Sequence, residues 1–593
     1  MSATDDVKAW LAALDAALSS GNSAAAADLF GDDCYWRDLV LFTWNIKTME
    51  GRGAITDMLD ATLASVQPSN WTLEGEGSEA DGVTEGWFTV ETAVARGKGH
   101  VRLMGGKCWT FLTTMVELKG HEEAKGTTRP HGVEHGAFEK RESYKERRDR
   151  ESAEFGSETQ PYCVIVGGGQ GGIAMGARLK RLGVPTVILE KNDRPGDSWR
   201  NRYRSLCLHD PVWYDHLPYL PFPDHWPVFS PKDKIGDWLE SYTRIMELEY
   251  WTKTVCDSAS YDEAAGEWTV NIIRDGQPMT LRPKQLVLAT GMSGIPNMPE
   301  IPGKDGFQGD CWHSSKHPGG DAFAGKKAVV IGSNNSAHDI CADLWESGAD
   351  VTMVQRSSTH VVKSETLMEI ALGALYSEEA VANGVTTDMA DLIFASLPYG
   401  VLPALQRAGA DATKERDKDY YDRLAAAGFD VDFGDDETGL FMKYLRRGSG
   451  YYIDVGAGEL VANGSIKLAK GQISEMTPSG VVVDGQELPA DLVVFATGYG
   501  SMNGWAAQII SQEVADKVGK CWGLGSDTTK DPGPWEGELR NMWKPTQQDA
   551  LWFHGGNLHQ SRHYSQFLSL QIKARQAGIP TPVYGLQEVH HVA

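Results

Sequence analysis

The segment YCVIVGGGQGG, residues 162–172, runs from a short apolar strand straight into a glycine-rich turn. A helical pattern follows at residues 174–182, and a second apolar strand at residues 186–189 leads to Glu190. Strand, turn, helix, strand and terminal acid together form the G-x-G-x-x-G pattern of a dinucleotide-binding βαβ unit. The segment therefore predicts a parallel sheet with a nucleotide at its carboxyl edge.

Each of the three glycines of the G-x-G-x-x-G turn has a separate physical role. Gly167 allows the tight bend, Gly169 lets a pyrophosphate approach the backbone, and Gly172 lets helix and strand pack closely. Free amides and the dipole at the helix start hold the phosphates, and the Glu190 carboxylate accepts hydrogen bonds from ribose hydroxyls. An acid at this place suits FAD.

The same pattern returns at residues 328–331, an apolar strand followed by the turn GSNNSA at residues 332–337. Asn334 occupies the place of the second glycine, and we expect it to tolerate a left-handed backbone there. A helix is predicted to about residue 347, with a strand at residues 351–354. The residues of this turn predicted to hold a cofactor are Gly332, Asn334, Asn335 and Ser336.

The second strand of this repeat ends in Gln355-Arg356-Ser357 where the first ends in an acid. A carboxylate would repel a 2′-phosphate, whereas a neutral Gln followed by Arg356 and Ser357 can bind it. The second site is therefore predicted to take NADPH, with NADH as the alternative if Arg356 is an ordinary surface residue.

Two further apolar strands, at residues 286–289 and 492–496, both run into Ala-Thr-Gly. Such an ending lets the backbone lie close to a bound dinucleotide, because no side chain larger than that of threonine intrudes. Thr290, Thr497 and Gly498 are therefore predicted cofactor contacts. Short strands alternate with helical patterns from residue 161 onward, which is typical of parallel α/β sheets.

Bulk composition excludes several classes of function. The chain has 593 residues, 41% of them apolar, and a net charge of -25, so its surface field repels nucleic acid and anionic membranes. No apolar run approaches the roughly 20 residues of a membrane span, and the acidic N-terminus lacks the basic start of a targeting peptide. Eight cysteines contain no C-x-x-C pair, which indicates no metal site and a reducing compartment. A cytoplasmic protein acting on a small molecule is expected.

The chain divides by pattern into a small α+β unit, a charged linker and a large α/β body. Helical periodicity at residues 7–18, 25–30 and 54–66 precedes strand-like runs at residues 71–74, 85–92, 101–103 and 108–118. This order resembles the cone-shaped ketosteroid isomerase-like, or nuclear-transport-factor-like, fold. The predicted parts are the α+β domain at 1–120, the linker at 121–160, a first part of the FAD domain at 161–324, the NAD(P)H domain at 325–490 with a helical insertion at 364–448, and a return to the FAD domain with the C-terminal segment at 491–593.

Between the two nucleotide turns stands FQGDCWHSSKHP, residues 307–318, which matches the fingerprint F-x-G-x-x-x-H-x-x-x-[aromatic or His]. On this motif the chain resembles the class B flavin-containing monooxygenases. The ending His317-Pro318 differs from the common forms and is similar to that of the type II branch. Gly196-Asp197-Ser198-Trp199-Arg200 and the run from Ser205 to Pro211 are similar to plant indole-3-pyruvate monooxygenases, and Baeyer-Villiger monooxygenases share the architecture.

The resemblance implies an NADPH-consuming enzyme in which a C4a-(hydro)peroxyflavin transfers one oxygen atom of O₂ to a small substrate. The oxygen acceptor would be a carbonyl compound or a soft nitrogen or sulfur atom. Ser198, Trp199 and Arg200 would lie beside the flavin, and Asn557 in the segment that closes over its pyrimidine ring. His209 would lie at the flavin edge and set the proton of the peroxide, or else pack against the flavin. His313 would stabilise the hinge between the domains rather than take part in chemistry.

Three other functions compete with this reading. A disulfide reductase shares the architecture but needs a redox-active cysteine pair, which the sequence lacks. An NAD(P)H oxidase would release H₂O₂ without any organic substrate. The N-terminal unit could be a separate isomerase or dehydratase with Asp33, Asp38 or Asp57 as base, or else a structural or oligomerising part. The helical insertion would cap the substrate channel or form a homodimer contact.

Overall fold

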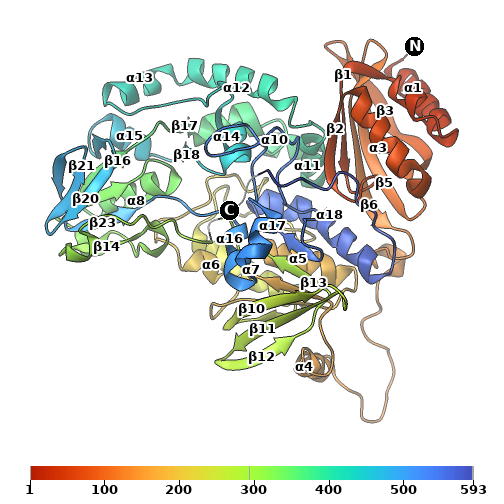
Figure 1. Ribbon diagram of the computed structural model, residues 1–593, viewed down its shortest axis with the longest axis horizontal. Helices are drawn as coiled ribbons and strands as arrows, with labels where there is room; N and C mark the ends of the chain where they lie inside the picture. The colour runs from red at the N-terminus through yellow and green to blue at the C-terminus, as the bar shows by residue number, and fades with distance from the viewer. Residues whose placement is uncertain (1, 293, 591–593) are drawn as a thin grey trace.

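The protein is described by a computed structural model over residues 2–292 and 294–590 (Figure 1). An N-terminal α+β unit packs beside a large body that contains two five-stranded parallel sheets, as the α/β prediction requires. Among the described residues, every helix is too short or too polar to traverse a bilayer.

The N-terminal unit combines three helices with one mixed sheet in the order β2-β1-β6-β5-β4-β3. Strand β1 runs parallel to β6, and the other neighbours are antiparallel. The helix predicted at residues 25–30 ends at Ala27, because Phe30 already begins a strand that the sequence pattern did not indicate. Its elements are α1 (Ala3–Ser19), α2 (Ser23–Ala27), β1 (Phe30–Leu39), β2 (Ile46–Glu50), α3 (Gly51–Val66), β3 (Ser69–Ala80), β4 (Val83–Glu91), β5 (Ala95–Met104) and β6 (Lys107–Leu118).

Aromatic rings fill the space that the curved sheet of this unit encloses. Ring centroids of neighbouring members lie 4.8 to 6.4 Å apart, the spacing of edge-to-face and offset-stacked pairs. The cluster consists of Trp10, Phe30, Trp36, Phe42, Trp71, Phe88 and Phe111. The interior of the unit is therefore a packed core.

Asp38, one of the acids considered as a base, is fully buried in this unit. Its carboxylate accepts hydrogen bonds from the backbone amides of Phe42 and Thr43 and from the hydroxyls of Thr43 and Thr113. Burial raises its pKa to about 6 although these hydrogen bonds oppose the shift. The acid fixes the turn after β1, and its side chain is closed off from solvent.

The linker contains two short helices, and the second lies against the first parallel sheet's edge region. The Ser152 hydroxyl donates to Glu249 at 2.6 Å, and the Arg148 guanidinium donates to the carbonyl of Glu247 at 3.2 Å. The helices are η1 (Gly126–Thr128) and α4 (Tyr144–Glu154).

The first parallel sheet has the order β24-β13-β7-β8-β9, with the predicted strand 162–166 at its centre. A three-stranded antiparallel sheet, β10-β11-β12, extends from it. Its elements are β7 (Cys163–Val166), α5 (Gln170–Arg181), β8 (Thr186–Leu189), α6 (Asp197–Arg200), α7 (Lys232–Ile245), β9 (Tyr250–Trp251), β10 (Thr254–Asp262), β11 (Glu267–Arg274), β12 (Gln277–Leu281), β13 (Gln285–Leu288), β24 (Leu551–Phe553) and α18 (Leu558–Gln576).

The second parallel sheet has the order β14-β23-β15-β16-β19. Both β14 and β23 belong to it, so the chain enters this sheet before residue 325 and returns to the first sheet only at β24, not at residue 491. Its elements are β14 (Asp310–His313), β15 (Lys327–Ile331), α8 (Asn335–Glu346), β16 (Asp350–Gln355), α15 (Ala457–Ala462), β19 (Lys467–Lys470), β23 (Leu492–Phe495) and the small sheet β20 (Ile473–Thr477), β21 (Gly480–Val483), β22 (Gln486–Pro489).

Helices occupy most of residues 364–448, between the paired strands β17 (His360–Lys363) and β18 (Tyr451–Asp454). Ser377 and Thr386 cap two of these helices by accepting hydrogen bonds from backbone amides three residues on. The helices are α9 (Ser364–Leu367), the π-helical turn η5 (Met368–Leu372), α10 (Glu378–Ala382), α11 (Thr387–Ala395), α12 (Leu402–Arg416), α13 (Lys418–Ala426) and α14 (Gly439–Arg447).

A buried ion pair joins the N-terminal unit to the body. The Arg37 guanidinium on β1 donates two hydrogen bonds to Glu538, at 2.7 and 2.9 Å, and both side chains are almost fully buried. Arg37 also donates to the carbonyl of Ala395, at the end of α11, and to the Tyr564 hydroxyl on α18. One cation thus contacts the insertion, the C-terminal segment and α18.

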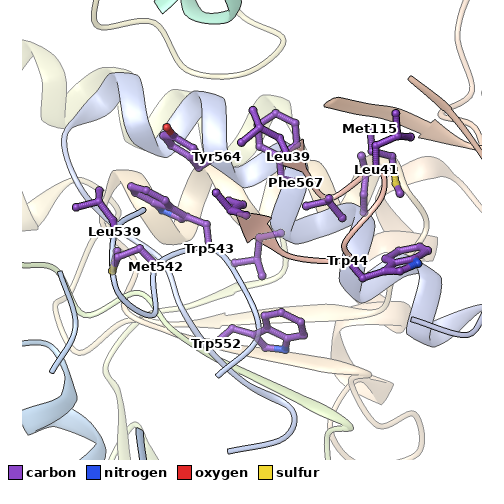
Figure 2. Packing of buried hydrophobic residues seen from close by; sticks show 14 of the residues in the cluster. Leu39, Leu41, Trp44, Met115, Leu539, Met542, Trp543, Trp552, Tyr564 and Phe567 are labelled. Atoms are coloured by element: carbon purple, nitrogen blue, oxygen red, sulfur yellow. The ribbon is translucent and has the colours of Figure 1, made fainter. Parts of the chain in front are cut away.

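Apolar side chains continue this contact (Figure 2). Leu39, Leu41, Trp44 and Met115 of the N-terminal unit lie near Phe567 and other side chains of the body in one buried cluster. Tyr564 stacks on Trp543 with centroids 3.9 Å apart. Because buried side chains of both parts belong to this one cluster, the N-terminal unit and the first parallel sheet share one hydrophobic core.

Candidate active site

In the first glycine turn, two glycines are required by the protein backbone and one leaves space for a ligand. Gly167 has a φ of +108°, and a Cβ there would lie 2.3 Å from the Ala289 carbonyl oxygen. A Cβ on Gly172 would lie 1.9 Å from the Gly167 carbonyl oxygen. Gly169 has neither constraint, since the nearest atom to its Cβ position is Ser198 Oγ at 3.6 Å. The protein itself does not require a glycine at 169, and the open space there fits a pyrophosphate.

Buried polar groups without partners gather around this turn. Thr290 Oγ1, both ring nitrogens of His554 and Ser561 Oγ have no hydrogen-bond partner among the described residues. A Cβ on Gly171 would contact His554 and Ser561 at 3.4 and 3.7 Å, so both border the start of α5. Buried polar atoms in native proteins are normally paired. Their convergence is the behaviour expected of a polar cofactor site, and it supports Thr290 as a contact.

Glu190 holds the glycine turn from the neighbouring strand end. One carboxylate oxygen accepts from the Gly168 amide at 3.0 Å and the other from the Asn192 amide at 2.8 Å. The Tyr250 hydroxyl donates to the Gly168 carbonyl at 2.7 Å. Each oxygen retains a lone pair, so the predicted ribose contact remains a prediction.

The segment Ser198-Trp199-Arg200 lies at the same turn, but its three side chains make different kinds of contact. Trp199 Nε1 donates to the Gln170 side chain at 3.2 Å, and Ser198 borders Gly169. The Arg200 guanidinium is instead paired with carboxylates of Asp197, Asp237 and Glu240. Its charge is paired within the protein, and a contact of Arg200 with the cofactor stays a prediction.

The second turn repeats the backbone of the first. Gly332 has a φ of +130°, and a Cβ there would lie 2.4 Å from the Ala496 carbonyl oxygen. Asn334 has φ -100° and ψ -169°, close to the -74° and -170° of Gly169. The expectation of a left-handed Asn334 is therefore wrong, because Gly332 alone carries the positive φ. An extended backbone accepts any side chain, which explains why Asn can replace the glycine.

Residues at the end of β16 separate into a buried and an exposed group. The Gln355 amide is buried and bonds to the backbone of Asp430 in both directions, at 3.0 and 2.8 Å, so it does not face a phosphate as predicted. Arg356 and Ser357 are exposed. Burial and the nearby charges of Arg447 and Arg356 lower the pKa of Lys530, which shows that Arg356 belongs to a group of cations. Such a group suits a 2′-phosphate.

Four further predicted cofactor contacts lie at the start of α8 or just after β23. They are Asn335, Ser336, Thr497 and Gly498. The Asn335 side chain accepts from the Ile453 amide at 3.0 Å, and Thr497 donates to the Asn297 carbonyl at 2.5 Å. A Cβ on Gly498 would meet nothing within 4 Å, so its neighbourhood is open.

His209 connects the two nucleotide units. Its Nε2 lies 3.4 Å from an Asp339 carboxylate oxygen on α8, and the same oxygen accepts from the Tyr203 hydroxyl at 2.6 Å. Burial disfavours the imidazolium, but the charge and hydrogen bond of Asp339 outweigh burial and raise the pKa of His209. The imidazole of His209 is thus held between the segment after α6 and the helix of the second turn, beside a carboxylate that favours its protonated form.

His313 makes structural hydrogen bonds. Its Nδ1 accepts from the Ser315 amide at 3.2 Å, so the proton resides on Nε2, which donates to the Gly498 carbonyl at 3.0 Å. Burial lowers its pKa, which keeps the ring neutral. This arrangement joins β14 to the segment after β23, two neighbouring strands of the second sheet, and the role at a hinge between the domains stays a prediction.

Asn557 caps α18 and makes contact with the insertion side of the cleft. Its Oδ1 accepts from the Gln560 amide at 2.9 Å, and its Nδ2 donates to the Tyr214 hydroxyl at 3.3 Å. Arg562 donates to the carbonyls of Tyr214 and His216 and pairs through two 2.8 Å hydrogen bonds with Asp391 of α11. The insertion is thereby bound to the helix that begins at Asn557.

Sequence reasoning missed several of these residues because no local motif marks them. Both carboxylate oxygens of Asp215 are buried without a partner, and burial raises its pKa well above the usual range. Desolvation also raises the pKa of Asp210, next to His209, to about 6. The only signal in the sequence that could have identified these two acids is that they follow His209 closely in the chain.

Comparison with known proteins agrees with this geometry. A sequence model of the pyridine nucleotide-disulphide oxidoreductase family matches residues 164–434. An indole-3-pyruvate monooxygenase of Oryza sativa subsp. japonica is 31% identical over 364 residues, 60% of this chain and 82% of the relative. A probable indole-3-pyruvate monooxygenase of Arabidopsis thaliana is 32% identical over 57% of this chain and 75% of the relative. A crystal structure of cyclohexanone monooxygenase has the same fold over 70% of this chain and 88% of its own, with TM-score 0.50 and 21% identity.

Two glycine turns at the carboxyl edges of two parallel sheets define an oxidoreductase that binds two dinucleotides. All eight cysteines are unpaired, so the disulfide chemistry in the name of the matching family model has no cysteine pair here. The chain belongs to the class B flavin-containing monooxygenase family, and it is a flavin-dependent monooxygenase.

We expect Gly169→Val to abolish flavin binding while the fold survives. The added side chain occupies the open space beside Ser198, where no backbone atom opposes it. The purified variant should be colourless and should keep the far-ultraviolet circular dichroism of the parent. Gly172→Ala is the matched control, because its Cβ collides with the Gly167 carbonyl and should impair folding itself. A yellow Gly169→Val protein with one flavin per chain would contradict the assignment.

Proposed function

We propose that the chain uses NADPH, FAD and O₂ to oxygenate a soft nitrogen or sulfur atom of a small organic molecule. One oxygen atom enters the substrate and the other leaves as water, with NADPH supplying the two electrons. The observation that supports this proposal most directly is the His209–Asp339 pair, which holds a proton between the two nucleotide units.

Bound FAD, once reduced by NADPH, supplies the activation of O₂. The residues of the chain contribute position, enclosure and proton control. Gly169 and Asn334 provide room at the two turns, and Trp199 connects to Gln170 at the start of α5. The segment at Asn557 adds a donor that already reaches Tyr214. These groups fix the reacting parts of both cofactors relative to each other.

The protonation of the activated oxygen selects the substrate. A protonated, neutral oxidant is electrophilic and reacts with soft nitrogen or sulfur, whereas a deprotonated one is a nucleophile that attacks carbonyl carbon. In the imidazolium form that Asp339 favours, His209 has a proton that it can donate to the oxidant, and we take this donation as what keeps the oxidant neutral. This argument places heteroatom oxygenation ahead of Baeyer-Villiger attack on a carbonyl compound.

The second candidate is an NADPH oxidase that reduces O₂ only to H₂O₂. It would share both nucleotide sites and consume NADPH at the same rate with or without an organic compound. One experiment separates the functions: turnover under ¹⁸O₂ with a panel of tertiary amines, sulfides, ketones and 2-oxo acids. We expect a single ¹⁸O atom in amine or sulfide products. Exclusive labelling of esters or acids would favour carbonyl chemistry, and full H₂O₂ recovery with every compound would favour the oxidase.

We expect the coupling of NADPH oxidation to product to depend on the His209 proton. The folded-state pKa of His209 is raised above its ordinary value of about 6.5, so coupling should be complete at low pH and fall as pH passes through the raised pKa. Asp339→Asn keeps an acceptor for Tyr203 but removes the charge. Burial then lowers the pKa, and the fall in coupling should move to lower pH. Product and H₂O₂ per NADPH, measured from pH 5.5 to 9, report both quantities.

A second imidazole–carboxylate pair, whose carboxylate also lies on α8, provides a matched control. His317 Nε2 lies 3.3 Å from Asp343, and both groups are buried. Asp343→Asn should therefore leave the pH dependence of coupling unchanged. If Asp339→Asn also left it unchanged, His209 would be a packing residue and another group would control the proton.

A further inference from the structure

The helical insertion forms one wall of a groove that the cofactor sites do not use. The groove encloses about 850 Å³, within the range of small-molecule sites. Trp213 and Phe229 contribute aromatic surface from the first nucleotide unit, and Phe229 is 38% exposed. Met368 adds an apolar side chain from the π-helical turn η5, a type of turn that often marks functional sites.

Negative charge dominates the lining of this groove. Its charged residues are all acidic, namely Glu365, Glu369, Glu378 and Glu379. Glu369 pairs with Arg416 at 2.5 Å, and Glu378 accepts from Trp213 Nε1 at 3.1 Å. The carboxylates of Glu365 and Glu379 make no ion pair within the part of the chain that the structure describes. Two exposed carboxylates without an ion pair thus stand beside the half-buried Trp213 and the exposed Phe229.

Ser364 gives an independent indication of a ligand. The residue lines the groove and is only 6% exposed, yet its hydroxyl has no hydrogen-bond partner among the described residues. An unpaired buried hydroxyl is costly, and such groups in native proteins call for an explanation. A polar hydrogen on a bound molecule would satisfy it.

We propose that this groove is a binding site for a small organic cation with an aromatic or apolar body. The carboxylates attract the charge, and the side chains of Trp213, Phe229 and Met368 provide aromatic and apolar surface for the body of the molecule. Anions such as 2-oxo acids are repelled by the same carboxylates. The substrate class in the names of the similar plant enzymes is thus disfavoured at this surface.

The groove lies next to the cleft between the nucleotide units. Trp213 precedes Tyr214, whose hydroxyl accepts from Asn557 and whose ring meets Tyr376 edge to face at 4.9 Å. Tyr376 in turn precedes the groove residue Ser377. The two tyrosines, each adjacent in sequence to a lining residue of the groove, therefore connect the groove to the start of α18. We assign the groove as an outer station for cationic substrates; this role rests on the proposed function, whereas the binding itself does not.

Calorimetric titration of the FAD-loaded enzyme with benzyltrimethylammonium tests the binding site without turnover, because a quaternary nitrogen has no lone pair to oxygenate. We expect saturable binding that weakens with salt, and no binding of phenylacetate. Glu365→Gln/Glu379→Gln should weaken binding of the cation by roughly three- to tenfold, since each exposed charge contributes modestly. Glu475→Gln/Glu513→Gln removes two exposed charges elsewhere and should change nothing. Equal affinity for cation and anion, or no effect of the groove variant, would overturn the site.

Ser364→Ala tests the unpaired hydroxyl with a readout that a structural role would not give. Phenethylammonium, which carries N–H donors, should bind several-fold more weakly to the variant, while benzyltrimethylammonium should bind as before. The melting temperature should not fall, because no hydrogen bond within the protein is lost. A lower melting temperature with unchanged phenethylammonium binding would show that the hydroxyl serves the fold.

Turnover then distinguishes failure of the site from failure of the proposed function. With N,N-dimethylbenzylamine, the groove variant should raise KM and leave kcat unchanged. Cation binding without any amine oxidation would refute the proposed function and leave the site intact. Amine oxidation with an unaltered KM in the groove variant would refute the role as an outer station.

Discussion

Helix α18 is enclosed on every side, and this constraint governs how the separate parts of the chain must meet. Fifteen of its residues are buried, among them Arg562, His559 and His563. Buried charges and polar groups need partners inside the protein. Asp391 of the insertion pairs with Arg562, and Arg37 of the N-terminal unit donates to Tyr564. Helix α18, whose N-cap is Asn557, is therefore held by two segments that lie outside the nucleotide-binding units.

The N-terminal unit supplies one of the partners that the buried helix α18 needs. Its aromatic cluster fills its interior, and the Asp38 carboxylate is hydrogen-bonded within the turn after β1. Its outer contribution is Arg37, which reaches Glu538, the end of α11 and α18 at once. Breaking a buried pair of this kind costs about 3–5 kcal/mol, because the remaining charge stays desolvated. The unit thus supports the flavin-binding body from outside.

Sequence patterns located both nucleotide turns because strand, glycine turn and helix are contiguous and each position has a local steric cause. Gly167 and Gly332 are examples, since a Cβ at either would strike a carbonyl oxygen. The patterns failed where the cause is tertiary. α18 is buried yet polar, so its burial leaves no apolar periodicity to detect, and the partners of Arg37 and Arg562 lie hundreds of residues away. The sequence pattern predicts that Gln355 contacts a phosphate, because its actual hydrogen bond, to the backbone of Asp430 in a distant loop, leaves no local signal.

The central claim is that the N-terminal unit and the flavin-binding body form one cooperative structure around α18. Differential scanning calorimetry of the flavin-loaded enzyme, with flavin fluorescence recorded over the same temperature range, tests it most directly. The shared core predicts one transition, in which flavin is released as the N-terminal unit unfolds. Two separated transitions, with the N-terminal unit melting first while flavin remains bound and quenched, would contradict the claim and show that the two parts are independent domains.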